Sequence, residues 1–352
     1  MKLFGFKQKP KGYLGVDIGA CGVKVVQLNP GAGGKAMLFT YGFAERAAGE
    51  APLSVLEHSD EVGKLLKEVC GKARTTTSAA IGALPIPQVF SSVVNIAPAE
   101  KKELKAVVDR EAKKLLPRPL EEMALDFKEL PPVAVKGTAQ VSETQKTIEV
   151  LLTAAPKDIV DKYRALLADA GLVPVSLETE AFALIRALLG SDPTPTVIVD
   201  IGGVRSNIIL TDRGIPVLTR SVEVGGGRCT EAIATSLKVP PARAEELKRD
   251  LGEGKLPQAC GNIFEPLLNE LKNTIAVYKT GNTSGRQIER IVLTGGGALL
   301  GGLTEFFSAQ FRVRAFIGNP WEQVATHSDL KPILANLGPR LAVAVGLALR
   351  KI

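Results

Sequence analysis

The tetrapeptide Val-Asp-Ile-Gly occurs twice in this sequence, and each copy places a carboxylate at the end of an apolar run. The acidic residues are Asp17 and Asp200, and each is followed by a short glycine-containing stretch and a second apolar run. This order predicts a strand, a tight turn and a second strand. Two such turns facing each other would supply backbone N–H groups for phosphate oxygens and two carboxylates for a hydrated Mg²⁺. The spacing therefore predicts a phosphate and metal site built by two similar lobes.

The elements expected around the two turns repeat one plan, in which three strands open each half of the chain. This order predicts mixed sheets with helices on their faces. The expected strands are 12–18, 23–29, 36–43, 78–84, 172–178, 196–202, 206–211, 214–224 and 289–293, and the expected helices are 53–72, 179–189 and 341–349. The last helix, at about ten residues, is shorter than the roughly 20 residues of a membrane span, so we expect it in the core.

A segment that begins after Pro87 is expected to form a small α/β unit of its own. It contains strands at 89–96, 124–130 and 147–153, helices at 98–116 and 156–170, and a polar turn at 136–145. A mainly helical block follows the strands of the second half. The predicted division is a first lobe (1–86, 173–194 and 335–352), an inserted unit (87–172), a second lobe (195–224 and 286–334) and a helical subdomain (225–285).

Composition favours a globular protein of the cytoplasm. The 352 residues are 45% hydrophobic and 23% charged, which is typical of about two domains with a real core. Residues 1–11 lack the apolar core of a secretory signal. The four scattered cysteines and two histidines argue against zinc and for reduced thiols. The net charge of +7 comes with four Tyr, one Trp and no recognisable nucleic-acid-binding motif, so we expect no nucleic acid as partner.

Two basic segments each leave two interpretations open. The tail 1–11 carries four lysines and no acidic residue, so it could add weak attraction to an anionic membrane or serve as a disordered solubilising tail. The helix 98–116 carries lysines together with acidic residues. There we favour a solvated face with i,i+4 ion pairs over a binding surface.

Three motifs, taken in order, resemble the nucleotide loops of the actin-like ATPases. Asp17-x-Gly19-x-x-x-x-Lys24 resembles the first phosphate loop, Asp200-x-Gly202-Gly203 the second, and the stretch 293–298 the adenosine loop. Each motif alone is weak, but three in this order after apolar strands predict the α/β actin-like ATPase fold. That fold has two ribonuclease-H-like lobes and a nucleotide cleft.

Four stretches resemble more narrowly the PilM family of type IV pilus assembly proteins. They are 15–28, 176–184, 219–226 and 288–298, and the resemblance extends over almost the whole chain. The inserted α/β unit also resembles the arrangement in PilM and in the related division protein FtsA. We therefore expect the small inserted subdomain in the first lobe.

The resemblance implies that the chain binds ATP and Mg²⁺. Backbone amides of the two phosphate loops would hold the β- and γ-phosphates beside Lys24, and Asp17 and Asp200 would hold Mg²⁺ through water. Glu245 and Lys248 would contact the ribose, and Glu178 would be the catalytic residue that orients the attacking water. The remaining residues expected to contact nucleotide are Gly19, Ala20, Cys21, Gly22, Val23, Gly202, Gly203, Val204, Arg205, Gly226, Gly227, Gly295, Gly296, Gly297 and Ala298.

Each of these roles has a structural alternative. The two aspartates could stabilise turns through Asx interactions. The run Gly295–Gly297 could be an ordinary strand-to-helix turn, and Glu245 with Lys248 could be a surface ion pair. Glu178 could be an acid that favours a helix N-terminus.

Departures from the common motif concern side chains. Ala20, Cys21 and Gly22 replace hydroxyl residues of the first loop, Arg205 stands where relatives often have Thr or Ser, and Asn207 where some have Asp. Cradling by backbone amides survives these changes, whereas side-chain help in hydrolysis is put in doubt. We therefore expect slow or no ATP hydrolysis, and whether the chain is an enzyme stays open.

The resemblance implies an ATP-binding cytoplasmic scaffold on the inner-membrane face. Its expected partner is the cytoplasmic N-terminal peptide of a PilN-like inner-membrane protein, gripped by the first lobe and the inserted unit. Other pilus platform proteins, a pilus motor and self-association are further possibilities. The alternatives are an FtsA-like division protein or an active kinase or ATPase of the superfamily. Against them, the sequence stops at Ile352 directly after the closing helix and shows no sugar-binding polar cluster.

Overall fold

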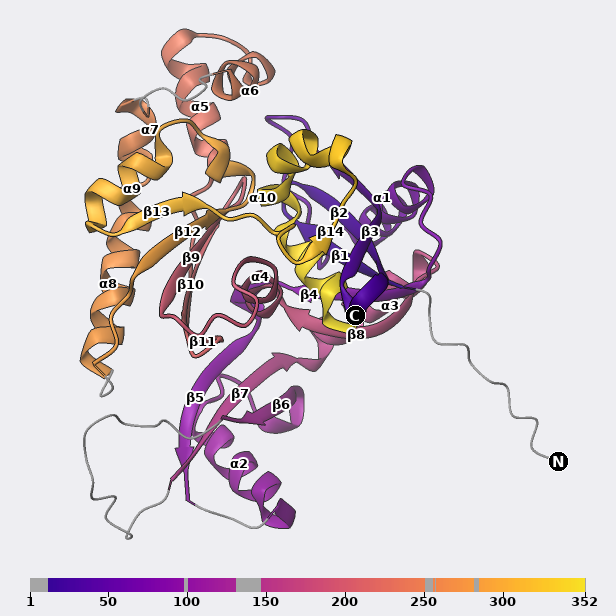
Figure 1. Ribbon diagram of the computed structural model, residues 1–352, viewed down its shortest axis with the longest axis vertical. Coiled ribbons are helices and arrows are strands. Elements are labelled where there is room, and N and C mark those ends of the chain that lie inside the picture. Colours follow the sequence, from indigo (N-terminus) through magenta and orange to yellow (C-terminus); the bar gives the residue numbers. More distant parts are fainter. Residues whose placement is uncertain are drawn as a thin grey trace, which may run out of the picture.

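The computed structural model describes residues 12–97, 101–130, 147–250, 256, 258–281 and 285–351. The basic tail 1–11 and the polar turn expected at 136–145 lie outside these residues. The described chain forms two sheets side by side with helices between and around them, and a smaller third sheet below (Figure 1).

The first lobe is built on a six-stranded sheet with the order β14-β3-β2-β1-β4-β8. β1 and β2 form an antiparallel hairpin, whereas β4 runs parallel to β1 and β8. Its strands are β1 (Tyr13–Gly19), β2 (Gly22–Pro30), β3 (Ala36–Glu45), β4 (Ala79–Leu84), β8 (Val173–Thr179) and β14 (Val324–Ala325). Alternate side chains of these strands reach opposite faces, so each face needs its own layer of helices.

The second lobe is built on a five-stranded sheet with the order β11-β10-β9-β12-β13. β9 and β10 repeat the antiparallel hairpin of the first lobe, and β12 runs parallel to β9. The strands are β9 (Thr196–Ile201), β10 (Ser206–Asp212), β11 (Ile215–Val222), β12 (Arg290–Thr294) and β13 (Arg314–Ile317). The sequence therefore predicted the repeated strand plan of the two lobes correctly.

Helices fill three layers around these sheets. α1 (Ser59–Lys72) and α3 (Lys157–Asp169) cover one face of the first sheet. α4 (Glu180–Leu188) and α10 (Lys331–Ala348) lie between the two sheets and share an apolar core with both (Figure 1). The outer face of the second sheet packs against α8 (Glu265–Gly281) and α9 (Leu303–Phe311), and the same core continues into α5 (Gly226–Leu237), α6 (Pro241–Arg249) and α7 (Gln258–Ile263).

The inserted unit is a three-stranded antiparallel sheet with the order β5-β7-β6. It consists of β5 (Phe90–Ile96), β6 (Met123–Glu129) and β7 (Ile148–Pro156), and α2 (Lys101–Leu115) packs on one face through Val108 and Ala112. The other face touches the second lobe, where Leu151 packs with Ile215. An ion pair of 2.6 Å between Arg213 and Glu149 supports this contact.

The packing of the core places two domain boundaries at residues other than those predicted from the sequence. α3 was expected in the inserted unit, but its residues Ile159 and Leu166 pack in the first lobe with Val16 and Leu66. By packing, the inserted unit therefore ends near residue 156. The chain also returns to the first lobe earlier than residue 335, because β14 pairs with β3 and Trp321 joins the core beneath it.

The closing helix α10 is longer than expected and lies in the core. It has 18 residues with Pro339 in its interior, whereas the sequence predicted about ten. Residues 328–351 are long and apolar enough to cross a membrane, but 61% of the most apolar stretch is buried within the fold, as in a core helix. The helix expected from residue 53 begins at Ser59, and α9, β13 and β14 were not expected.

Candidate functional site

The two hairpins place matching pairs of polar residues on facing edges of the lobes. In the first lobe, Lys24 lies opposite Asp17 across β1 and β2, and its Nζ is 3.2 Å from Asp17 Oδ2. In the second lobe, Asn207 lies opposite Asp200 across β9 and β10, and its Nδ2 donates to Asp200 Oδ2 at 3.5 Å. Asp17 is only 5% exposed. The repeated tetrapeptide therefore folds into the repeated carboxylate position that its sequence predicted.

A third carboxylate, Glu180, joins the two aspartates from the start of α4. Its Oε2 accepts from the backbone N of Ile86 at 3.1 Å and from Asn207 Nδ2 at 3.4 Å, so it connects the first lobe to the second. Desolvation, followed by the charges of Asp17 and Asp200, raises the pKa of Glu180 to about 8. The cluster thus holds a carboxyl group that is largely protonated at neutral pH.

The same crowding acts on the neighbouring charged groups. Desolvation and the charge of Asp17 raise the pKa of Asp200 to about 6. Desolvation opposes the charge on Lys24, but the charge of Asp17 and its hydrogen bond outweigh this and raise the pKa of Lys24. Three carboxyl groups therefore compete for one ammonium group, an arrangement that a bound cation would relieve.

The donor set fits Mg²⁺ held through water. Asp17, Asp200 and Glu180 offer carboxylate oxygens, which Mg²⁺ prefers while it keeps several of its waters. Within the described ranges, no group of three or more His, Cys, Asp or Glu side chains is placed to hold an ion directly. A hydrated ion is the form of metal that these residues suit.

The first and second glycine loops meet directly. A Cβ built on Gly203 would lie 2.2 Å from Cys21 Sγ, so the loop after β1 touches the loop after β9. The second loop is fixed by backbone bonds from Gly226 N to Gly202 O and from Gly227 N to Gly203 O, both 2.8 Å. A Cβ on Gly225 would lie 2.5 Å from Gly203 O, which explains the glycine there. The loop after β1 and the loop after β9 therefore lie against each other, and their backbone amides are close together.

The third glycine run lies beside Asp200. Gly295 has φ +83°, and a Cβ there would lie 2.4 Å from Ile201 O and 2.5 Å from Asp200 Oδ1. A Cβ on Gly297 would lie 2.5 Å from Ile201 Cγ2, and Ala298 is buried. The run is anchored to α10, because Gly295 N donates to Pro339 O at 2.9 Å. The structure therefore brings together the three glycine stretches that the sequence singled out.

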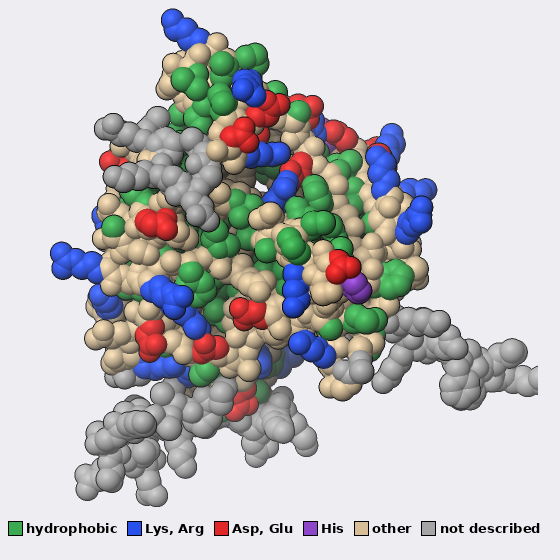
Figure 2. Space-filling model, turned by 45° about the horizontal axis from the view of Figure 1, so that its top comes forward, with side chains coloured by type: hydrophobic (Ala, Val, Ile, Leu, Met, Phe, Trp, Pro, Cys, Tyr) green, Lys and Arg blue, Asp and Glu red, His purple; other side chains and the backbone are tan. Residues whose placement is uncertain are grey.

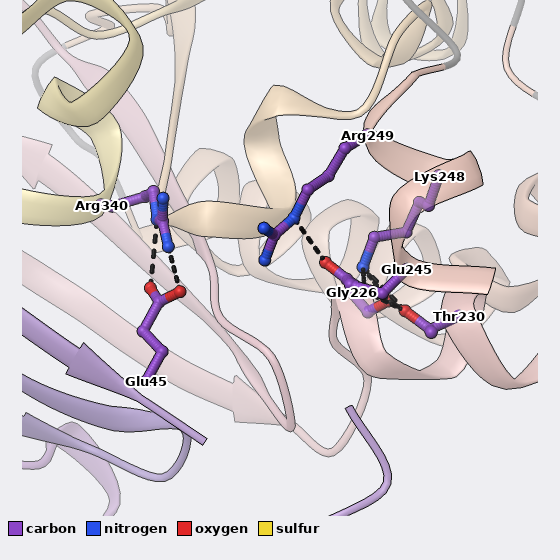
Figure 3. A network of polar contacts seen from close by, with 7 residues as sticks. All are labelled: Glu45, Gly226, Thr230, Glu245, Lys248, Arg249 and Arg340. Atoms are coloured by element: carbon purple, nitrogen blue, oxygen red, sulfur yellow. Dashed lines mark hydrogen bonds and ion pairs between the residues drawn. The ribbon is translucent and has the colours of Figure 1, made fainter. Parts of the chain in front are cut away.

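Glu245 and Lys248 form a polar network with the start of α5 (Figure 3). Their side chains are 2.5 Å apart, and Lys248 Nζ donates to Gly226 O at 3.1 Å. Thr230 donates from Oγ1 to Glu245 Oε2 at 2.6 Å and accepts from Lys248 at 2.8 Å. Desolvation alone would raise the pKa of Glu245, but hydrogen bonds from Lys248 and Thr230 lower it. The sequence missed Thr230, whose only signal is its place one turn after Gly226.

Charged side chains also line the opposite side of this region. Figure 3 shows Arg340 of α10 paired with Glu45 at the end of β3, to the left of the network of Glu245 in this view. In the same view the Arg249 side chain points toward this pair, while its Nε donates to Glu245 Oε1 at 3.1 Å. In the space-filling view, red and blue side chains gather around a hollow below the uppermost group of residues (Figure 2).

The expected role of Glu178 does not agree with its surroundings. Arg186 donates to both of its carboxylate oxygens, at 2.5 and 2.9 Å, and also to Gly346 O at 2.6 Å. This bidentate pair occupies the carboxylate of Glu178 and ties it to α10, outside the cluster of Asp17 and Asp200. Glu180, two residues later, is the glutamate that lies with Asp17 and Asp200.

The pKa values predict how the stability of the nucleotide-free protein depends on pH. In the unfolded chain Glu180 and Asp200 ionise near pH 4, whereas in the folded protein their pKa values are about 8 and about 6. Between these limits the folded state binds more protons, so the stabilisation present below about pH 4 is lost as pH rises toward 8. We expect Tm to fall by a few degrees from about pH 5 to about pH 8. Glu180→Gln should flatten this dependence, and parallel Tm curves would contradict it.

Comparison with known proteins identifies the family. The model of the family described as type IV pilus assembly protein PilM matches residues 15–352. A chain of the solved "PilM-PilN type IV pilus biogenesis complex" is 28% identical, with a TM-score of 0.77 over 96% of this chain and 98% of that one. Ethanolamine utilization protein EutJ from Carboxydothermus hydrogenoformans is 16% identical, with a TM-score of 0.55 over 98% of this chain and 91% of that one.

MreB5 of Spiroplasma citri bound to ADP shares the fold at greater distance. It is 13% identical, with a TM-score of 0.52 over 97% of this chain and 96% of that one. These likenesses confirm the actin-like ATPase fold that the three loops predicted. The family model covers nearly the whole chain, so this protein belongs to the PilM family of type IV pilus assembly proteins.

Proposed function

We propose that the chain binds Mg·ATP between its lobes and acts as an ATP-binding scaffold in type IV pilus assembly, on the cytoplasmic face of the inner membrane. The observation that carries this proposal is the meeting of Asp17, Asp200 and Glu180 beside glycine loops of both lobes. The related MreB5 structures, with bound ADP and AMPPNP, support a nucleotide there. The family match favours this function over the division-protein and kinase alternatives.

Each group at the site has a proposed task. Asp17 and Asp200 hold the hydrated Mg²⁺, whose positive charge would offset that of the phosphates. Backbone amides of 19–23 and 202–204 bind phosphate oxygens next to Lys24. Gly295–Gly297 let the base lie against backbone, and Glu245 and Lys248 bind ribose hydroxyls while Thr230 fixes their positions. Glu180 replaces Glu178 as the residue that orients the attacking water.

Turnover of ATP is expected to be slow. The first loop offers Ala20, Cys21 and Gly22 where a hydroxyl could assist, and Glu180 is largely protonated before nucleotide binds. Purified full-length chain with saturating Mg·ATP should release phosphate well below the roughly 1–10³ s⁻¹ of working enzymes. Phosphate release is measured with an enzyme-coupled assay, and Glu180→Gln serves as the control for contaminating ATPase. If the wild-type chain releases phosphate within this range and Glu180→Gln abolishes the release, the chain is an ATPase.

A PilN-like inner-membrane protein is the proposed partner. The family membership and the likeness to a chain of a PilM-PilN complex support this partner. We place its cytoplasmic N-terminal peptide on the first lobe and the inserted unit, which are joined where Ala155 at the end of β7 packs in the first-lobe core. Such docking would hold the chain at the membrane indirectly.

Hydrogen exchange measured by mass spectrometry tests this placement. A synthetic peptide that copies the cytoplasmic N-terminus of the PilN-like protein of the same genome is added to the full chain. Slower exchange is expected in β4, β8 and the inserted unit, since a docked segment covers backbone amides. A scrambled peptide is the control, and protection confined to α5–α9 would contradict the placement.

A further inference from the structure

The outer edge of β3 is unpaired over most of its length. β3 runs from Ala36 to Glu45 and lies between β2 and β14 in the six-stranded sheet. β14 pairs with it only at Ala36 and Met37, so residues 38–45 have a strand on one side only. Among the described residues, no backbone hydrogen bond joins the outer side of 38–45 to another segment. This stretch therefore offers unpaired N–H and C=O groups to an added strand.

Tyr41 and Phe43 carry backbone groups that point away from β2. Arg46 N donates to Cys21 O at 3.0 Å, which sets the alternation of hydrogen bonds along the hairpin of β2 and β3. Every second residue of an antiparallel strand bonds to a given neighbour. Counting back from Arg46 in steps of two gives the residues bonded to β2, and Tyr41 and Phe43 are the residues between them. Both lie beyond the register shift at Gln27, in the regular part of the hairpin.

The sequence of this edge contains none of the residues that usually prevent pairing. Residues 38–44 have no charged side chain and no proline, and Phe39 and Phe43 remain 45% and 39% exposed. Natural edge strands commonly carry lysine or proline against the addition of another strand. β8, the outer strand at the other end of this sheet, has Pro174, which lacks an N–H. The contrast favours pairing as the role of the free edge of β3.

The side chains of Tyr41 and Phe43 share one face of the sheet. Tyr41 packs against the core beneath α10, and the guanidinium carbon of Arg340 of α10 lies 5.1 Å from the centre of the Phe43 ring. Gly42 between them faces α1, because a Cβ there would lie 2.8 Å from Ala73 Cβ. An added strand therefore meets two aromatic side chains on the α10 face. Aromatic residues directly opposite each other stabilise a pair of antiparallel strands.

A second copy of the same edge matches this pattern. In a two-fold antiparallel pair centred on Gly42, Tyr41 of each copy lies opposite Phe43 of the other. Both are outward-pointing residues, so each such pair exchanges both of its main-chain hydrogen bonds. The register places Phe39 opposite Glu45, so no like charges meet, and it ends before Met37, where β14 begins. These three matches favour a second copy over an unrelated peptide.

We propose that two copies of this chain associate through β3, which forms one continuous sheet across a two-fold axis near Gly42. An interface made by a single pair of short strands is smaller than about 1,200 Å², a size typical of weak and reversible association. The inference goes beyond the proposed function, which concerns one copy of the chain. It depends on neither the nucleotide nor the PilN-like peptide.

Sedimentation velocity of the full chain over a range of concentrations measures this dimer. Wild type should dimerise reversibly, with a Kd of roughly 1 µM to 1 mM for an interface of this kind. Phe39→Glu puts a carboxylate opposite Glu45 of the other copy, twice in each dimer, so its Kd should rise about threefold or more. Val175→Glu adds the same charge to an exposed side chain of β8 and is the matched control, which should dimerise as wild type does. Melting curves check that each variant folds.

Disulfide trapping tests the register of the pair. In the proposed dimer the Cα atoms of Tyr41 and of Phe43 in the other copy lie about 5.5 Å apart, within the range that a disulfide bridges. Chains with Tyr41→Cys and chains with Phe43→Cys are mixed and oxidised with copper phenanthroline. Both carry Cys21→Ser, which removes the exposed cysteine of the described chain. Cross-linked dimer should form several-fold faster in the mixture than with either variant alone.

The outcomes separate self-association from other occupants of the edge. The proposal is overturned if wild type stays monomeric at about 1 mM. It is also overturned if Phe39→Glu dimerises like Val175→Glu, or if the mixed cysteine variants cross-link no faster than each alone. Hydrogen exchange in β3 should slow as protein concentration rises, since a paired edge protects its amides. Slower exchange there only after the PilN-like peptide is added would assign the edge to that peptide instead.

Discussion

Asp17→Ala and Asp200→Ala are each expected to weaken Mg·ATP binding by roughly 10- to 100-fold, the range for residues that hold a metal through its outer shell. Each change removes one side of the proposed hydrated-metal site, because Asp17 comes from the first lobe and Asp200 from the second. Isothermal titration calorimetry of the full chain with ATP and Mg²⁺ measures both affinities. With EDTA in place of Mg²⁺, the difference between the variants and wild type should largely vanish.

Loss of folding cannot explain such a result for Asp200. Its pKa is raised to about 6, so its ionised form is disfavoured in the folded protein without metal. Asp200→Ala should therefore fold with a Tm close to that of wild type. Asp60→Ala, on the exposed first turn of α1, is the matched control and should bind normally. Unchanged affinity in both site variants would remove the basis for placing the metal here.

Gly346→Ala is expected to destabilise the protein by about 3 kcal/mol, the upper part of the range for overpacking. α10 lies between the sheets in backbone contact with its neighbours. A Cβ on Gly346 would lie 1.9 Å from Ala183 O of α4, and a Cβ on Gly15 would lie 1.9 Å from Ala344 O. Because both contacts are to backbone, neither can be relieved by rotating a side chain. Thermal melting should show Tm lowered by about 6 °C.

Gly71→Ala on α1 is the matched control for this substitution. It adds the same methyl group within a helix, but nothing lies within 4 Å of the new Cβ. It should stabilise the protein by about 0.4–1 kcal/mol, because alanine lowers the conformational entropy of the unfolded chain. Comparing the Tm values of the two variants separates the effect of the contact between α10 and α4 from the effect of alanine on helix propensity. Equal Tm values for the two variants would show that α10 is not packed as described.

The main strands could be predicted because their signals are local. Alternating apolar residues and glycine turns define β1 with β2 and β9 with β10, and these hairpins need no distant contact to be recognised. β14 has two residues and β13 four, too few for a periodic pattern. α10 was underestimated because Pro339 interrupts the helical pattern. In the fold, the carbonyl of Pro339 instead anchors Gly295 of the second lobe.

The assignment of α3 shows a different limit. Its sequence follows β7 of the inserted sheet directly, so chain order suggests the same unit. Its apolar face, however, packs on α1 and the first sheet through Ile159 and Leu166. An amphipathic pattern shows that a helix has a buried face, but it does not identify the surface that covers it.

The site could be predicted where a residue type follows from its own loop. Asp17 and Asp200 end apolar strands, and the glycines lie where backbones approach closely, so the sequence could place both kinds of residue in the fold. The choice between Glu178 and Glu180 depended on contacts far along the chain. Arg186 and the carbonyl of Gly346 hold Glu178, while Asn207 of the other lobe contacts Glu180. Thr230 likewise gains its role only when α6 packs against α5.

A crystal structure of the full chain with Mg²⁺ and a non-hydrolysable ATP analogue tests the central claim most directly. The claim predicts that the phosphates contact the backbone amides of 19–23 and 202–204. It also predicts a hydrated Mg²⁺ between Asp17 and Asp200, and the base against Gly295–Gly297. Nucleotide bound elsewhere, or none at saturating concentration while the fold is intact, would contradict it.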